Sequence, residues 1–146
     1  MIILAALFVS LFVFRALGFA GVAALSSWHV CARDAMGVML LFTAAAHFTA
    51  MKEDLIRMIP SWIPSPRAIV YFTGICEIAG ALGLFVPQLN RAAGAALVLF
   101  FLAILPANIQ AVKAGITLRG KPPTDLILRI PMQLLFIAWV WWSVRL

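Results

Sequence analysis

A small set of polar side chains, set within long apolar stretches, is where this sequence could do chemistry. An ionisable residue inside an apolar segment is expensive to bury, so it is a candidate for a functional site by default. The titratable or charged members of the set are Arg15, His47, Glu77 and Arg129, and their polar companions are Asn108, Gln133, Thr43, Thr73 and Cys76.

The spacing of these residues groups them on helix faces. Three pairs are four positions apart, namely Thr43 with His47, Thr73 with Glu77, and Arg129 with Gln133. Residues with this spacing share one face of a helix. At 1.5 Å per residue, the polar residues of the last four predicted spans lie roughly 5–15 Å from the predicted inner ends of their helices, and Arg15 lies about 20 Å from that of the first. We therefore expect His47, Glu77, Asn108, Arg129 and Gln133 to line one polar pocket, with Thr43 and Thr73 beside them.

Two prolines fall at the level of this predicted pocket. Pro106 lies two residues before Asn108, and Pro131 lies between Arg129 and Gln133. A proline inside a helix removes one backbone hydrogen bond and frees a carbonyl in the preceding turn. The sequence thus predicts kinked helices and extra acceptors there.

The residue types suit hydrogen bonding and proton transfer better than metal or thiol chemistry. Imidazole and amide groups bond carbonyl oxygens, and a carboxyl can relay protons. The only histidines are His29 and His47, without HxxxH spacing, and Cys31 and Cys76 form no CxxC pair. We expect no metal site, no haem and no dithiol mechanism.

A structural role is the alternative for each polar residue. Glu77 within a membrane would be either neutral or matched to a cation, and Arg15 is the candidate for a structural ion pair. Arg129 could extend its charge to the membrane surface, and Asn108 and Gln133 could simply join helices.

The elements that must position these residues are membrane-spanning helices. The chain has 146 residues, 65% hydrophobic and 11% charged, with a mean hydropathy of +1.09. This composition excludes an ordinary soluble domain. Continuous apolar runs of this length are typical of membrane helices and not of β-barrel strands. We expect a single all-α domain with five spans: Ile2–Leu25, Ala35–Met51, Arg67–Val86, Ala92–Val112 and Leu126–Val144.

The net charge of +6 indicates membrane orientation and not nucleic-acid binding, because most basic residues lie in the connections. The N-terminal side would carry Lys52, Arg57, Arg67, Lys113, Arg119 and Lys121, and the other side Arg33, Arg91 and Arg145. The excess predicts a multi-pass protein of the inner membrane, with a cytoplasmic N-terminus and an external C-terminus. The apolar connection from Lys52 to Pro66 should lie along the membrane surface or under the helices.

Over residues 35–144 the chain resembles the DoxX family of small membrane proteins. The resemblance rests on Leu41–Phe48, on Met58 to Pro60, on Thr73–Ala81, on Leu105 to Asn108 and on Arg129 to Gln133. It implies a four-helix bundle, to which the first helix, within residues 1–25, is an addition. Members are linked to sulfur and thiol redox systems, and one is similar to the small subunit of a thiosulfate:quinone oxidoreductase.

Three functions remain open from the sequence. In the first, the chain is a subunit of a membrane redox complex, without a redox centre of its own, whose pocket binds a quinone and whose basic loops contact a redox partner protein. In the second, the pocket binds or transports another small lipophilic molecule without electron transfer. In the third, the chain is a structural membrane partner surrounded by lipid. Whether the chain is an enzyme is left undecided by the residues.

Overall fold

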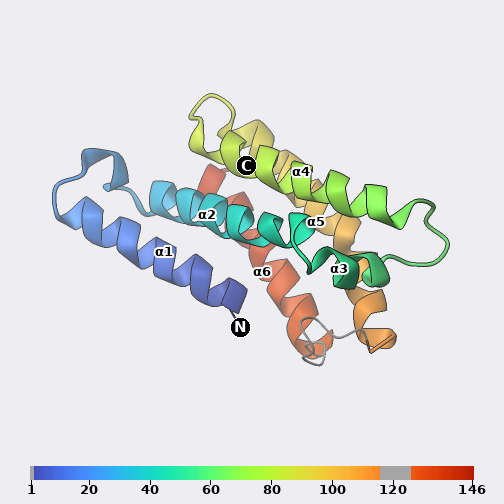
Figure 1. Ribbon diagram of the computed structural model, residues 1–146. Coiled ribbons are helices and arrows are strands. Elements are labelled where there is room, and N and C mark those ends of the chain that lie inside the picture. Colours follow the sequence, from blue (N-terminus) through green and yellow to red (C-terminus); the bar gives the residue numbers. More distant parts are fainter. Residues whose placement is uncertain (1, 116–125) are drawn as a thin grey trace.

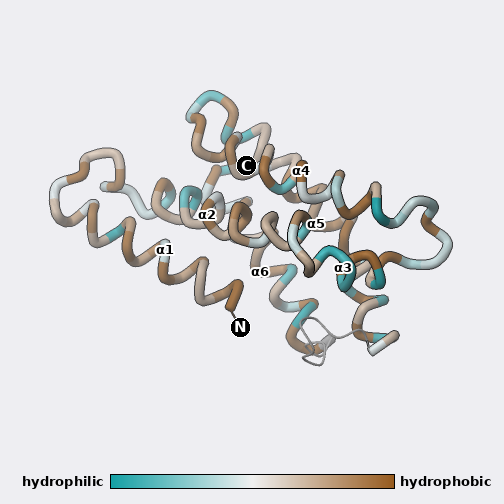
Figure 2. Tube along the Cα trace, viewed as in Figure 1, coloured by the Kyte–Doolittle hydropathy of each residue, from teal (hydrophilic) through white to brown (hydrophobic). Residues whose placement is uncertain are grey.

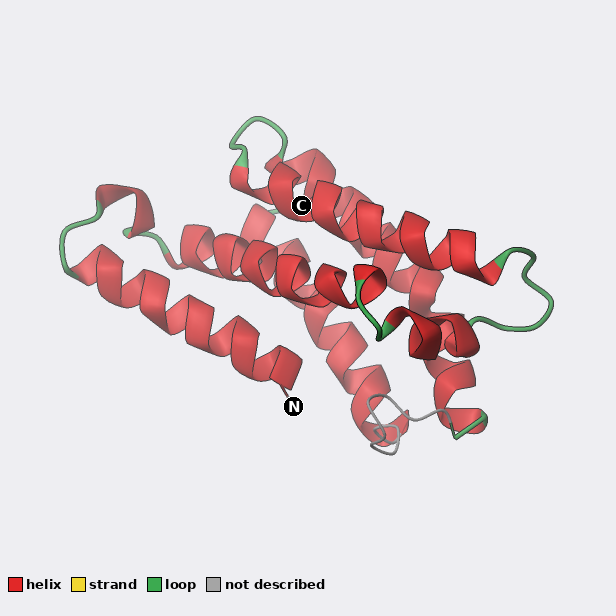
Figure 3. Cartoon of the chain, in the orientation of Figure 1, coloured by secondary structure: helices red, strands yellow, loops and turns green. Residues whose placement is uncertain are grey.

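The computed structural model describes residues 2–115 and 126–146, and these form helices and connections without strands (Figures 1 and 3). The elements are α1 (Ile2–Phe19), η1 (Ala23–Leu25), α2 (Trp28–Phe48), α3 (Lys52–Met58), α4 (Pro66–Phe85), α5 (Asn90–Lys113) and α6 (Leu126–Val144). Five of them, α1, α2, α4, α5 and α6, are long and apolar enough to cross a membrane. The predicted all-α, multi-pass membrane fold is confirmed.

Helices α2, α4, α5 and α6 form a closed bundle. Within the described ranges, α2 packs on α4, α4 on α5, α5 on α6, and α6 back on α2, while the diagonal pairs do not meet. Successive helices run in opposite directions, and α1 lies outside the ring along α2 (Figure 1). The ring places the α2 and α6 faces that carry polar residues toward α4 and α5.

The first connection differs from the prediction. Helix α1 ends at Phe19 and not at Leu25, because the chain turns at Gly21, whose φ of 104° belongs to the left-handed region that favours glycine. Helix α2 begins at Trp28, seven residues before the predicted start at Ala35. Arg33 and Asp34 interrupt the apolar run here, so hydropathy did not indicate this first part of the helix. In the structure Arg33 Nε donates to Asp34 Oδ1 at 2.9 Å.

Small residues set the contacts of α5 with its neighbours. A Cβ placed on Gly83 of α4 would lie 2.7 Å from the Cβ of Ala93 on α5, so the two helices approach closely there. Gly94 of α5 similarly faces Val144 of α6. Such contacts let helices pack tightly where lipid offers no hydrophobic driving force.

Hydrophobic side chains cover both the core and the outer faces of the helices. Hydrophilic residues are concentrated in α3 and the turns, as the teal segments of Figure 2 show, with a few positions inside the long helices. The outward faces of α1 and α6 carry large exposed side chains, including Phe12 and Ile127. In a membrane these faces contact lipid.

The connection from Lys52 to Pro66 folds partly into the short helix α3, which packs against α2, α4 and α5. Arg67 donates to Glu53 at 3.1 Å and so ties α3 to the start of α4. These contacts place α3 at one end of the bundle, which agrees with the expected position of this connection under the helices. The predicted polar loop Lys113–Asp125, with Arg119 and Lys121, lies for the most part outside the described residues.

Candidate functional site

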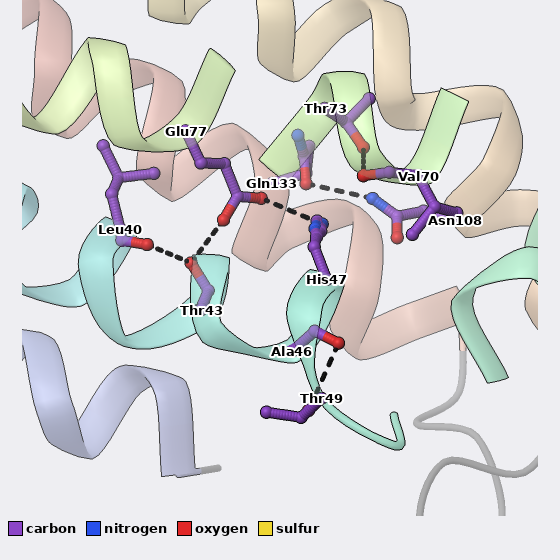
Figure 4. A network of polar contacts seen from close by, with 10 residues as sticks. All are labelled: Leu40, Thr43, Ala46, His47, Thr49, Val70, Thr73, Glu77, Asn108 and Gln133. Atoms are coloured by element: carbon purple, nitrogen blue, oxygen red, sulfur yellow. Dashed lines mark hydrogen bonds and ion pairs between the residues drawn. The ribbon is translucent and has the colours of Figure 1, made fainter. Parts of the chain in front are cut away.

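The carboxyl group of Glu77 on α4 has one partner from α2 at each oxygen (Figure 4). Thr43 Oγ1 donates to Oε2 at 2.9 Å, and His47 Nε2 lies 3.8 Å from Oε1. Thr43 and His47 are one helical turn apart, so a single face of α2 contacts the whole carboxyl group. We call Thr43, His47 and Glu77 the α2–α4 cluster.

The Thr43 hydroxyl also lies 3.0 Å from the Leu40 carbonyl of its own helix. A hydroxyl has one proton, so it donates to one oxygen at a time. When it donates to Leu40, one of its lone pairs can accept a hydrogen bond from the O–H of a neutral Glu77. The cluster therefore accommodates either form of the carboxyl group.

His47 carries a polar atom that has no partner among residues 2–115 and 126–146. The residue is 8% exposed, as is Glu77, and its Nδ1 is buried without a hydrogen bond. A buried polar atom left unpaired is rare and calls for an explanation. With Nε2 facing Glu77, Nδ1 is the nitrogen that a bound molecule would use, as an acceptor in neutral imidazole and as a donor in imidazolium.

Gly74 of α4 makes room for the His47 ring. A Cβ at Gly74 would lie 2.6 Å from the Cβ of His47 and 2.9 Å from its Cγ, so α2 and α4 could not approach this closely with a larger residue. Gly74 is three positions before Glu77 and shares its face. Gly74 was not among the predicted site residues, although its spacing of three from Glu77 places both residues on one face of α4.

A second cluster joins α5 to α6 with the same geometry. Arg129 Nη1 donates to Asn108 Oδ1 at 3.5 Å, and Asn108 Nδ2 donates to Gln133 Oε1 at 3.3 Å. Arg129 and Gln133 are again one turn apart on one helix and contact one residue of the next. We call these three residues the α5–α6 cluster.

Gln133 is buried, and its amide nitrogen donates to the carbonyl of Phe101 at 2.7 Å. The missing N–H of Pro106 frees the carbonyl four residues earlier, that of Leu102, whereas Phe101 lies five residues before the proline. Gln133 therefore binds a backbone carbonyl of α5 next to the one that the proline frees, and the predicted extra acceptor stays a prediction.

The predicted set is therefore divided into two clusters on four helices. Figure 4 shows Thr43, His47 and Glu77 of the first cluster, with Asn108 and Gln133 of the second, pointing into the space between the helices. Two members take other positions. Thr73 donates to the Val70 carbonyl of its own helix at 3.0 Å. Arg15 donates to the Leu25 carbonyl at 3.3 Å, so the structure does not bring it to Glu77, whose nearest basic group is His47.

A depression of about 340 Å³ is lined by Thr49, Ala50, Met51 and Asp54, and its lining includes no residue of either cluster. It begins two residues after His47, at the turn from α2 into α3. Among residues 2–115 and 126–146, no group of three or more His, Cys, Asp or Glu side chains is placed to hold a metal ion.

The model of a protein family described as "Domain of unknown function (DUF8561)" matches residues 36–144. The matched segment begins within α2 and includes α4, α5 and α6, so it covers the bundle with both clusters and leaves out α1. No curated protein and no solved structure matches the chain.

Proposed function

Since the chain belongs to the family described as "Domain of unknown function (DUF8561)", we propose its function from the buried clusters: it is a membrane subunit that binds a quinone headgroup at His47. The observation that carries the proposal is the unpaired Nδ1 of His47, buried within the bundle while Nε2 faces Glu77. A carbonyl or hydroxyl group on a lipophilic molecule supplies the partner that this atom lacks.

The protonation chemistry of His47 fits both forms of such a ligand. Neutral imidazole with its proton on Nε2 accepts a hydrogen bond from a hydroxyl, and imidazolium donates one to a carbonyl. Glu77 stabilises the imidazolium and fixes the tautomer, as a carboxylate beside a histidine does in general acid–base sites. Thr43 holds the second oxygen of that carboxyl group.

When a quinone is reduced to the quinol, it takes up two electrons and two protons, one proton on each carbonyl oxygen. In this proposal the electrons come from a redox partner protein, His47 gives one proton from Nδ1, and the second carbonyl oxygen takes its proton from water; oxidation of the quinol reverses each transfer. Glu77 offsets the charge on His47. The choice of quinone among lipophilic carbonyl compounds follows the resemblance to the DoxX family, which itself stays a prediction.

A structural role is the second candidate, and the α5–α6 cluster favours it. Asn108, Gln133 and Arg129 contact one another, and Gln133 also binds the Phe101 carbonyl. A polar group satisfied by the next helix contributes to association in a membrane, typically by about 0.6 kcal/mol per interaction. The two clusters then differ in role, with the α5–α6 cluster joining helices and the α2–α4 cluster binding a ligand.

The test is the lipid content of the purified protein. The wild type and His47→Phe would be purified in mild detergent, extracted with organic solvent and analysed by mass spectrometry. The proposal expects quinone in the wild type and several-fold less in His47→Phe at equal yield of folded protein. If another lipophile is found in the wild type and is lost in His47→Phe, that molecule is the ligand in place of quinone. If both proteins give the same extract, or give none, the clusters have only a structural role.

A further inference from the structure

The guanidinium group of Arg15 lies against two aromatic rings at the turn between α1 and α2. Its Cζ is 3.8 Å from the centre of the Phe19 ring and 5.1 Å from the Trp28 ring. Nη1 donates to the Leu25 carbonyl, which also accepts from the Cys31 thiol. Backbone and aromatic faces from three elements thus hold the group in one place.

The charge of Arg15 has no carboxylate partner in the described part of the chain. Asp34, Asp54, Glu53 and Glu77 lie within ion-pair distance of other basic residues, and none of these pairs includes Arg15. A guanidinium has five N–H donors, yet the Leu25 carbonyl is the one acceptor found here, and Nε is buried without a partner. The half-buried guanidinium therefore has donors left over for an anion.

Arg15 lies near the end of the apolar helix α1, within reach of the headgroup level of a membrane. Four residues separate it from the end of α1, which corresponds to about 6 Å along the helix. Phe19 and Trp28 are 75% and 46% exposed, and tryptophan is enriched at the membrane–water interface. A long side chain at this depth extends its charge toward the headgroups.

Gly18 provides the space that this arrangement needs. A Cβ at Gly18 would collide with the Leu25 carbonyl oxygen and lie 3.0 Å from Arg15 Nη1. The glycine therefore allows the turn to fold back over α1 and the guanidinium to lie beneath it. The position of Arg15 follows from the local fold and not from a free surface rotamer.

We propose that Arg15, between Phe19 and Trp28, binds the phosphate of an anionic phospholipid at the end of the bundle where α1 meets α2. The planar guanidinium matches two phosphate oxygens with parallel N–H donors, which a lysine cannot do. The aromatic faces hold its plane at the interface. A lipid bound there adds to the existing contacts of α1 with the bundle, which are its packing on α2 and the ring contact of Phe8 with Trp139 of α6.

The experiment compares thermal unfolding of the detergent-purified chain after addition of phosphatidylglycerol, phosphatidylcholine of the same acyl chains, or inorganic phosphate. The proposal expects phosphatidylglycerol to raise the midpoint temperature more than phosphatidylcholine does, and phosphate alone to have no effect. Arg15→Gln should lose this difference, whereas Arg91→Gln, which removes one exposed charge elsewhere, should keep it.

Arg15→Lys guards against a variant that does not fold, because it keeps the charge and removes the paired donors. Its phosphatidylglycerol-dependent rise should fall to less than half that of the wild type. A full effect from inorganic phosphate would assign the site to free phosphate and overturn the lipid. An undiminished phosphatidylglycerol effect in Arg15→Lys, or an equal loss of stability in all lipids for Arg15→Gln, would mean that Arg15 only closes the end of α1.

Discussion

Thr43 and His47, one turn apart on α2, each face a different oxygen of Glu77 on α4, at 2.9 Å and 3.8 Å. This relationship fixes the carboxyl group at both oxygens from one neighbouring helix. It also decides which nitrogen of His47 remains for a ligand. The proposed binding site depends on this arrangement of three side chains, and the predictions below test its parts.

Thr43 and Thr73 form a matched pair for testing the hydrogen bond to Glu77. Both hydroxyls contact the carbonyl three residues earlier, but only Thr43 also donates to Glu77. We expect Thr43→Val to lower the free energy of unfolding by about 0.6–1.7 kcal/mol, the range for polar contacts between membrane helices. Thr73→Val should change it by less than about 0.5 kcal/mol. Reversible unfolding in mixed detergent micelles measures both, and equal losses would remove Thr43 from the cluster.

Glu77→Gln and Glu77→Leu separate the charge of Glu77 from its hydrogen bonds. The amide can still bond Thr43, so Glu77→Gln should fold but bind a short-chain benzoquinone roughly tenfold more weakly, a change of about 1.4 kcal/mol. Glu77→Leu removes both the ion-pair partner of His47 and the acceptor of the Thr43 hydroxyl, which costs about 1–3 kcal/mol of stability. Calorimetric titration and detergent unfolding give the two quantities. Unchanged quinone affinity in Glu77→Gln would show that the charge plays no part in binding.

Gly74→Ala tests the close approach of α4 to His47. Because the new Cβ would lie 2.6 Å from the Cβ of His47, which cannot move without its helix, we expect a loss of about 1–3 kcal/mol and weaker quinone binding. Gly80→Ala is the control, since its Cβ would meet the outer part of the Leu97 side chain, Cδ2 at 2.5 Å and Cγ at 2.9 Å, which can turn away without moving its helix. If Gly80→Ala destabilises the protein as much as Gly74→Ala, the contact with His47 has no special importance.

The charge distribution predicts the orientation of the five spans. With an odd number of crossings the termini lie on opposite sides, and the basic residues favour a cytoplasmic N-terminus. Alkaline phosphatase fused to the C-terminus should be active, and a green fluorescent protein fused there should be dark. A fluorescent and phosphatase-negative C-terminus would reverse the orientation.

The sequence was sufficient to predict the spans and the faces of two of the three spaced pairs. Apolar runs reveal spans directly, and i, i+4 spacing placed Thr43 with His47 and Arg129 with Gln133. The spacing could not show which helix each face would meet, because that depends on the closed ring of α2, α4, α5 and α6. Thr73 shares the spacing but bonds its own helix, an option always open to a threonine.

The position of Arg15 and the boundaries near it required the structure. Arg15 has a long side chain whose direction depends on the turn at Gly21 and the place of Leu25, and neither follows from hydropathy. The start of α2 was missed for a related reason, since Arg33 and Asp34 compensate each other inside the helix. In both cases a contact between two residues decides the local structure, and the mean hydropathy of the segment does not reveal it.

The most direct test of the quinone site is the nitrogen magnetic resonance spectrum of histidine-labelled protein with and without a short-chain benzoquinone. His29 and His47 are the two histidines, and His29, whose Nδ1 lies 3.0 Å from the Trp142 carbonyl, serves as the internal control. The account predicts that the quinone shifts the Nδ1 signal of His47 and leaves both signals of His29 in place. A quinone that is retained by the protein while the His47 Nδ1 signal does not move would contradict it.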